Sequence, residues 1–192
     1  MYEDYFIVDI ETSPLDVQAY TELEEEDRLK LLNPIDSKII GIGIRYKWQN
    51  RIFTGDDEKD LLKSFWHEWE RIMREAPNSV IVGFNINNFS IPFIITKSFI
   101  NNVQVKSFSM KSIIDVRERI NAYRYGKTKG KLTDYGELLG INVIKKESDK
   151  MADLYLRKDY EQLHTYIEND LVAIDEIFKR LKETGIINIS KW

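Results

Sequence analysis

Runs of β-branched and apolar residues, separated by polar turns, predict the strands of this chain. Residues 5–12 lead from apolar side chains into two acids, and we expect Ser13 and Pro14 to end this strand. Four later runs share the same apolar, β-favouring character: 38–46, 51–54, 79–84 and 113–116. A short polar segment at 48–50 joins the first two of these runs, which predicts a hairpin.

Apolar residues at helical spacing predict the helices. One stripe follows Gly55-Asp56-Asp57 and ends before Pro77: Leu61, Leu62, Phe65, Trp69 and Ile72. Three further helices are expected at 91–101, 132–140 and 160–184, with glycine closing the last two. Residues 15–37 hold an acidic cluster mixed with leucines, which predicts a short helix on a surface excursion.

Strands that alternate with helices after an initial hairpin predict an α/β fold, with a mixed central β-sheet flanked by helices. A length of 192 residues and a hydrophobic share of 43% fit a single domain over residues 1–192. No apolar run is long enough to span a membrane, and no basic-then-apolar leader precedes the first strand. We therefore expect a soluble, intracellular (cytoplasmic) protein without membrane contact.

The composition narrows the chemistry that the chain can perform. It has no cysteine and two histidines, His67 and His164, which excludes thiolate chemistry and histidine-rich metal sites. Any metal is then expected to be held by oxygen atoms, and this favours Mg²⁺ or Mn²⁺. The net charge of −4 does not exclude nucleic-acid binding, because an acidic metal site can lie beside a local basic patch.

Asp9 and Glu11 lie two residues apart at the end of the first predicted strand. Alternate side chains of a strand share a face, so the two carboxylates project together. They repel each other unless a cation lies between them, and this predicts a divalent-metal site. Taken alone, the segment also fits a solvated strand end.

The last predicted helix carries a second polar pair. Tyr166 and Asp170 are four residues apart, so they share a helix face about 6 Å apart along the axis. An apolar stripe borders them: Leu163, Ile167, Leu171, Ile174, Phe178 and Leu181. Asp170 is thus expected near a buried face, where an isolated carboxylate is costly. A core tyrosine beside a surface acid is the alternative for this helix alone.

Three motifs occur in order along the chain, at residues 8–12, 83–94 and 166–170. In this order they resemble the DEDD family of 3′–5′ exonucleases, and closest its tyrosine subtype, which includes the proofreading domains of family B DNA polymerases. The histidine subtype is set aside because the position five before the final aspartate is Thr165. The resemblance covers nearly the whole chain and implies a ribonuclease H-like fold.

The resemblance implies hydrolysis of the terminal phosphodiester at DNA or RNA 3′ ends with two Mg²⁺ or Mn²⁺ ions about 3.5–4 Å apart. It also implies that Asp9 bridges both ions, while Glu11 and Asp170 complete the surroundings of the first. Tyr166 is expected to orient the attacking water by a hydrogen bond.

The second motif departs from the family at one position. The family has its third carboxylate directly after the aromatic residue Phe89, whereas this chain has Ser90. Serine is a neutral and weak ligand, so the second metal site is expected to be weakened. Three side chains could lend an oxygen atom to the second site, although the last is more typical of a structural salt bridge or a cap: Asn87, Asn88 and Asp115. Asn85, Phe89 and Ser90 are expected to bind the terminal nucleotide.

Two hypotheses from different classes stay open. The first is a metal-dependent 3′–5′ exonuclease weakened at its second metal site. The second is a catalytically inactive exonuclease-like module that binds nucleic acid or associates with a polymerase. A chain of 192 residues leaves no room for polymerase palm or fingers regions. We therefore expect a stand-alone exonuclease-like domain, with a polymerase or another DNA replication or DNA repair protein as partner.

Both hypotheses predict contact with single-stranded 3′ ends. The richest basic stretch interleaves two tyrosines, Tyr123 and Tyr125, with six cations: Arg117, Arg119, Arg124, Lys127, Lys129 and Lys131. The three lysines, on a loop expected to be flexible, are candidates for substrate binding, and a solvated loop is the alternative. A phosphate-binding loop is rejected because Asn121 stands where its first glycine belongs.

Overall fold

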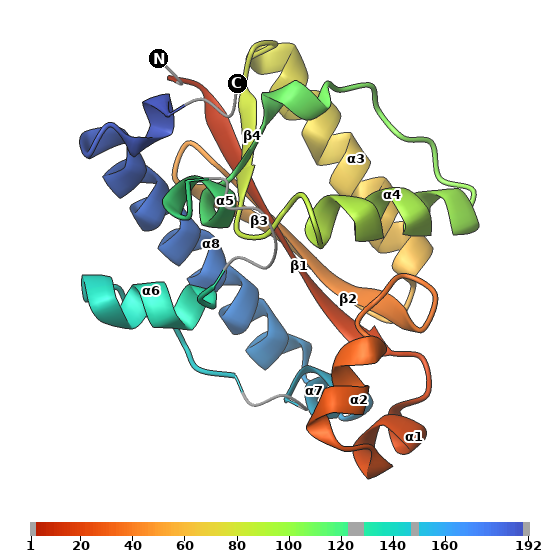
Figure 1. Cartoon of the computed structure of the whole chain (residues 1–192). Coiled ribbons are helices and arrows are strands. Elements are labelled where there is room, and N and C mark those ends of the chain that lie inside the picture. Colours follow the sequence, from red (N-terminus) through yellow and green to blue (C-terminus); the bar gives the residue numbers. More distant parts are fainter. Residues whose placement is uncertain (1–2, 123–128, 147–149, 190–192) are drawn as a thin grey trace.

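A five-stranded mixed sheet forms the centre of the computed structural model, which describes residues 3–122, 129–146 and 150–189 (Figure 1). The strand order is β3-β2-β1-β4-β5. The strands are β1 (Tyr5–Pro14), β2 (Ser37–Tyr46), β3 (Gln49–Thr54), β4 (Val80–Gly83) and β5 (Ile113–Asp115). β1 pairs antiparallel with β2 and parallel with β4, which confirms the mixed sheet expected from the sequence.

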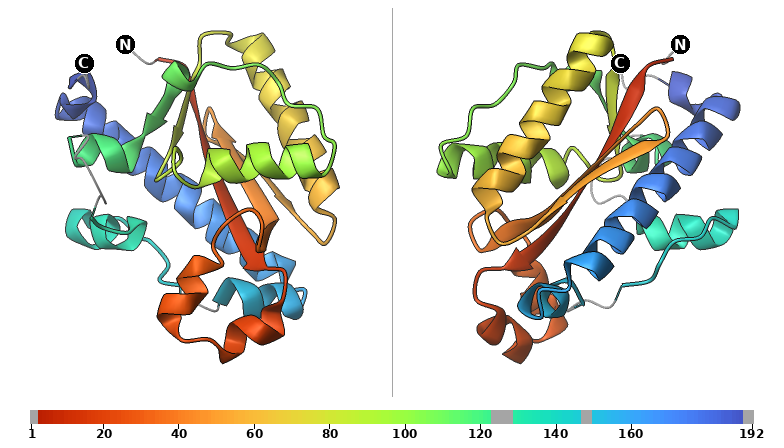
Figure 2. Two further views of the ribbon diagram at one scale, coloured as in Figure 1. Left: turned by 45° about the vertical axis from the view of Figure 1, so that its right-hand side comes forward. Right: turned by 180° about the vertical axis from the view of Figure 1, so that it is seen from behind.

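Helices cover both faces of this sheet (Figure 2). One face carries α3 (Glu58–Glu75) and α4 (Ser90–Ile100). The other carries α8 (Tyr160–Glu183) with α5 (Val116–Ile120) and α6 (Leu132–Leu139). Three short helices gather at the end of β1: α1 (Val17–Glu22), α2 (Glu25–Lys30) and α7 (Lys150–Leu156). Two 3₁₀ turns complete the description, Met110–Ser112 and Ile186–Asn188.

The alternation of side chains along β1 separates two hydrophobic cores. Phe6 and Val8 face α3, whereas Ile7 faces α8. All the residues expected on the apolar stripes of α3 and α8 are buried. Trp69 is 1% exposed and its ring packs edge-on to Phe6, so its predicted core position is confirmed. No helix among the described residues is long and apolar enough to cross a membrane.

The predicted end of β1 and the predicted position of the turn between β2 and β3 are wrong. β1 does not end at Thr12, where Ser13 and Pro14 were expected to break it, but continues to Pro14, which pairs with Ser37. Proline is tolerated at the end of a strand, where its missing N–H is not needed by the ladder. The hairpin turns at Lys47 and Trp48, both with positive φ (47° and 70°), rather than at residues 48–50. These residue types do not signal such a turn, because asparagine and glycine usually occupy it.

Several short helices are not predicted by the sequence pattern. The acidic excursion contains two helices, α1 and α2, where one was expected, and α5 and α7 were not expected at all. Each has seven residues or fewer, which is too short to repeat a 3.6-residue pattern. The helices at α3, α4, α6 and α8 lie where they were predicted, and Gly140 closes α6 with a φ of 70°.

Asp115 holds the turn between β4 and α4. Its side chain is 2% exposed at the end of β5. One carboxylate oxygen accepts hydrogen bonds from the backbone N–H groups of Asn85 and Arg117 at 3.0 Å, and the other accepts from the N–H of Asn87 at 3.1 Å. Asp115 is therefore a helix cap, and it also orders the second motif, where Asn85 adopts a φ of 56°.

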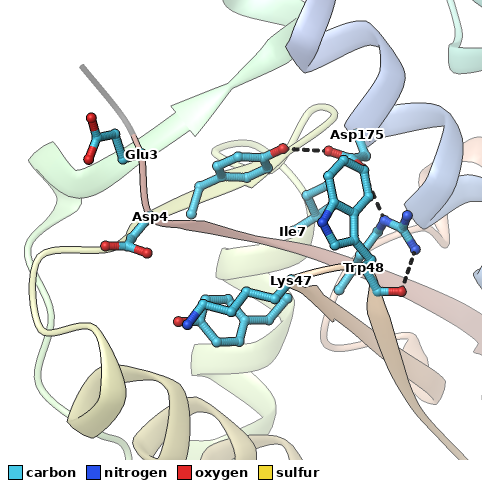
Figure 3. A pocket seen from close by; sticks show the side chains of 9 residues that line it. Glu3, Asp4, Ile7, Lys47, Trp48 and Asp175 are labelled. Carbon is cyan, nitrogen blue, oxygen red and sulfur yellow. Dashed lines mark hydrogen bonds and ion pairs between the residues drawn. The ribbon is translucent and has the colours of Figure 1, made fainter.

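A buried polar cluster fastens α8 to the sheet. Asp175 of α8 accepts a hydrogen bond from the hydroxyl of Tyr5 at 2.7 Å and pairs with Arg45 at 3.1 Å (Figure 3). Although burial opposes ionisation, the hydrogen bonds from Tyr5, Lys179 and Arg45 lower the pKa of the Asp175 carboxyl. The cluster links α8 to both β1 and β2.

Replacing Asp115 with alanine should destabilise the protein by about 2–4 kcal/mol, because buried backbone N–H groups lose their acceptor. Urea unfolding followed by circular dichroism measures this change in the free energy of unfolding. Asp134→Ala is the matched control, since the exposed Asp134 accepts one backbone N–H at the start of α6. It should cost about 1 kcal/mol or less. Equal losses in the two variants would contradict the special role of Asp115.

Candidate metal centre

β1 and α8 bring three carboxylates together on one face of the sheet. Asp9 and Glu11 project from β1 towards α8, and Asp170 projects from α8 towards them. One carboxylate oxygen of each residue lies within 4.8 Å of those of the other two. Asp170 is 7% exposed, so the group lies largely inside the protein. The predicted sharing of a face by Asp9 and Glu11 is confirmed.

The second motif begins directly beside this strand. β4 pairs with β1 only up to Ile7 and ends at Gly83. A side chain at Gly83 would lie 2.9 Å from the carbonyl oxygen of Val8 and 2.8 Å from Ile86, so only glycine allows this approach. The turn that carries the second motif therefore starts next to the residue that precedes Asp9.

Burial and mutual repulsion raise the pKa values of two of these acids. Desolvation, then the charges of Asp170 and Glu11, raise the pKa of Asp9 well above its usual value. Burial raises the pKa of Asp170 to about 6, with Lys146 opposing the shift and Glu11 adding to it. The protein thus holds a negative group that favours a proton or a cation.

Lys146 supplies a cation that sequence reasoning missed. Its ammonium group pairs with the carboxylates of both Glu11 and Asp170. Burial opposes ionisation of Lys146, but the charges of Glu11, Asp170 and Asp9 more than offset this effect and raise its pKa. A lysine in an irregular segment of the chain carries no local signal for such a role.

Asn169 fixes the segment that leads to Lys146. Its side-chain oxygen accepts the backbone N–H of Ile144 at 2.7 Å, and its amide donates to the carbonyl of Asn142 at 2.9 Å. Asn169 directly precedes Asp170 on α8, so one helix turn holds both the acid and the segment that bears the lysine. The ammonium also lies 5.6 Å from the ring centre of Tyr166, which is 8% exposed.

The three carboxylates fit one hard divalent cation. One oxygen of Asp170 is buried and has no hydrogen-bond partner, which is costly unless a cation binds there. The donors are all oxygens, the ligands that Mg²⁺ and Mn²⁺ prefer. Among the residues that the structure describes, no fourth acid belongs to this group. The residues therefore fit one ion better than two.

The other candidates for substrate binding have separate positions. Ser90 is 2% exposed at the first residue of α4, and Phe89 packs against Phe93 with ring centres 4.8 Å apart. Lys129 and Lys131 are exposed before α6, whereas Lys127 lies outside the described residues. Their contact with nucleic acid, like the roles of Asn85, Phe89 and Ser90, stays a prediction.

Two further expectations concern the basic stretch and Asp115. Arg119 donates a hydrogen bond to the carbonyl of Ile187 at 3.3 Å, so part of its guanidinium is engaged within the protein. Arg124, Tyr123 and Tyr125 lie outside the described residues. Asp115 uses both carboxylate oxygens as acceptors of backbone hydrogen bonds, which favours the cap, one of its two expected structural roles, over a metal ligand.

A small cavity of about 130 Å³ lies at the opposite end of β1. Its lining includes Asp4, Trp48 and Asp175 but none of the three clustered carboxylates (Figure 3). The polar cluster around Asp175 accounts for the charged groups there. The candidate metal centre is therefore a cluster on the sheet face and not this cavity.

Comparison with known proteins agrees with the fold. The family model described as the exonuclease domain of family B DNA polymerases matches residues 24–140, more than half of the chain. The chain belongs to this family. The match includes the second motif but not Asp9, Glu11 or Asp170, so the acidic cluster is an independent observation of the structure.

Two known proteins are similar to this chain, one in sequence and one in fold. An uncharacterised protein of the archaeon Methanocaldococcus jannaschii is 28% identical over 170 residues, which cover 81% of this chain and 92% of that protein. The family B DNA polymerase of the hyperthermophilic archaeon Pyrobaculum calidifontis superimposes with a TM-score of 0.69 and 15% identity over 95% of this chain. That likeness shows the ribonuclease H-like fold, and the chain spans 25% of the polymerase.

Replacing Lys146 with methionine should destabilise the ion-free protein by about 2–4 kcal/mol, because two carboxylates lose their buried cation. Mn²⁺ should then raise the melting temperature of Lys146→Met more than that of the parent protein. Lys145→Met is the matched control, since Lys145 pairs with Glu137 at the exposed surface. An equal response to Mn²⁺ in both variants would show that Lys146 does not occupy a cation position.

The affinity for Mn²⁺ should rise with pH. Folding raises the pKa of Asp170 from 3.8 to about 6. The contribution of Asp170 to the stability of the ion-free protein therefore falls as the pH rises from 3.8 to about 6. Metal binding needs the ionised acid and has the opposite dependence. Calorimetric titration should therefore give an affinity at least about tenfold higher at pH 7 than at pH 5, because the raised pKa of Asp9 acts in the same direction. A constant affinity across this range would contradict the assignment of Asp170 as a ligand.

Proposed function

We propose that this protein is a divalent-metal-dependent 3′–5′ exonuclease that hydrolyses the terminal phosphodiester of a nucleic acid. The observation that carries the proposal is the cluster of Asp9, Glu11 and Asp170 with a buried, unpartnered oxygen on Asp170. Membership of the polymerase exonuclease family supports nucleic acid as the substrate. Mg²⁺ and Mn²⁺ are the proposed cofactors, because the donors are all hard oxygen ligands.

The proposed reaction transfers the terminal nucleotide to water. The oxygen of a water molecule attacks the phosphorus of the terminal phosphodiester, and the bond to the 3′ oxygen of the preceding nucleotide breaks. A nucleoside 5′-monophosphate leaves, and the attacking water gives up a proton to solvent. The 3′ oxygen of the shortened strand takes a proton from solvent and becomes a 3′ hydroxyl. A divalent ion bound by the carboxylates would supply Lewis-acid activation of this chemistry.

The side chains of this protein have distinct proposed roles. Asp9, Glu11 and Asp170 hold the cation, and their shared negative charge sets its position between β1 and α8. Tyr166 lies one turn before Asp170 on α8 and orients the attacking water through its hydroxyl. Asn85 and Phe89 shape the pocket for the terminal base, and the exposed Lys129 and Lys131 contact the backbone of the strand.

Ser90 supports a second candidate function. A neutral, buried hydroxyl stands at the position where the family has a carboxylate. A domain that lacks this acid holds its second metal weakly, so the chain would bind 3′ ends without cleaving them. This candidate is a nucleic-acid-binding or polymerase-associated module. We favour the nuclease because Asp9, Glu11, Tyr166 and Asp170 are all present around one cation position.

The decisive experiment measures degradation of 3′-labelled single-stranded DNA and RNA in the presence of Mg²⁺ or Mn²⁺. Asp9→Ala should abolish cleavage, and Ser90→Asp should raise its rate by at least about tenfold by restoring the missing charge. Asp153→Ala serves as the control, because Asp153 is an acid outside the cluster that pairs with Arg157 at the surface. It should leave the rate unchanged.

The possible results separate the two candidate functions. Cleavage by the parent protein that disappears in Asp9→Ala supports the nuclease. Cleavage by Ser90→Asp alone supports an inactive protein with an otherwise intact site. Retained binding of labelled strands without cleavage by any variant would overturn the nuclease proposal and favour the binding module.

A further inference from the structure

The face of β2 that packs against α8 lacks side chains at two positions. Gly43 pairs with Asp9 across the sheet, and Gly41 pairs with Glu11. Each of the two acids on β1 therefore has a glycine as its neighbour on β2. The register shifts directly after Glu11, which marks an irregularity at the same place.

α8 fills the space that these glycines leave. A Cβ atom at Gly43 would lie 2.4 Å from Cγ2 of Ile167 and 2.8 Å from Cδ1 of Leu171. A Cβ atom at Gly41 would lie 2.5 Å from Cδ1 of Ile167. All three distances are shorter than real Cβ contacts, so α8 could not lie this close to a β2 with larger residues.

The residues of α8 that occupy this space flank the acid of the metal centre. Leu171 directly follows Asp170, and Ile167 precedes it by three residues. One oxygen of Asp170 is buried and unpartnered on this segment of helix, which points to a ligand there. Any displacement of the helix at Gly43 thus moves Asp170 relative to Asp9 and Glu11.

We propose that Gly41 and Gly43 are positioning residues, whose lack of side chains sets the distance of α8 from the sheet and so brings Asp170 to the acids of β1. For metal binding, this inference rests on the proposed function of the cluster. The two glycines act through the helix and do not touch the cation or the substrate. Their role explains why a strand that packs against a long helix carries no side chains at these two positions.

The two glycines differ in how strictly they set the distance. At Gly43 the obstacle is Cγ2 of Ile167, which branches from Cβ and has a strongly preferred rotamer in a helix. The backbone of α8 must therefore move to accept an alanine there. At Gly41 the obstacle is Cδ1, the far end of the same side chain. Gly43→Ala should thus have the larger effect.

The test compares Gly43→Ala, Gly41→Ala and the double variant Gly41→Ala/Ile167→Val with the parent protein. Ile167→Val removes Cδ1, the atom that an alanine at 41 would meet, but keeps Cγ2. Gly185→Ala is the control for stability, because a side chain is strained at its φ of 73° beyond the end of α8. The measurements are Mn²⁺ affinity by electron paramagnetic resonance, melting temperature, and crystal structures of Gly43→Ala and the parent.

We expect Gly43→Ala to lower the affinity for Mn²⁺ at least about tenfold, as loss of a supporting residue does at other metal sites. Gly185→Ala should lower the melting temperature without changing this affinity. The double variant should recover the affinity that Gly41→Ala loses. An affinity of Gly43→Ala within about twofold of the parent, or an unmoved Asp170 in its crystal structure, would overturn the proposal.

If the parent protein binds no Mn²⁺, the proposed function is overturned. The crystal structures then test the positioning role of the glycines by themselves. A longer separation of Asp170 from Asp9 in Gly43→Ala than in the parent then supports the role of Gly43. An unchanged separation overturns it. If Gly43→Ala does not fold, Gly41→Ala and its double variant decide the question by the same two measurements.

Discussion

Electrostatic repulsion among Asp9, Glu11 and Asp170 is the constraint on which the arrangement of this protein depends. Three carboxylates within 4.8 Å in a largely buried place are unfavourable unless protons or cations compensate them. The ammonium group of Lys146 compensates part of this charge, because it pairs with two of the acids. One oxygen of Asp170 still has no partner. An acidic group that is only partly compensated is suited to bind a further cation.

The packing of α8 explains how this unfavourable group is held. Asp175 fastens the helix to Tyr5 and Arg45 on one side of the cluster. A long apolar stripe buries the rest of the helix against the sheet, and the hydrophobic free energy of that stripe offsets the electrostatic cost. The side chain of Asn169 forms two hydrogen bonds that attach the segment carrying Lys146 to the same helix. The helix is thus both the support of the third acid and the anchor of its neutralising lysine.

The second motif has a well-defined turn but carries a serine at the position where an acid is expected. Its turn is well ordered, because Asp115 accepts backbone N–H groups of Asn85 and Asn87 and because Gly83 approaches β1 closely. The position after Phe89, where the resemblance leads us to expect a carboxylate, is the buried Ser90. The chain keeps the geometry that places this motif beside Asp9 while it lacks one charge. The acidic cluster contains three acids among the described residues.

The sequence by itself determined the long elements and the ligand types. Strand and helix periods predict β1, α3 and α8, and the resemblance of three ordered motifs to a known family singles out the acids at 9, 11 and 170. Tertiary structure alone decided the rest. Lys146, Asn169 and the glycines of β2 act on residues distant in sequence, and short elements such as α5 and α7 lack a full periodic pattern. Local sequence carries propensity and periodicity, whereas the distance between a helix and a sheet depends on side chains from both.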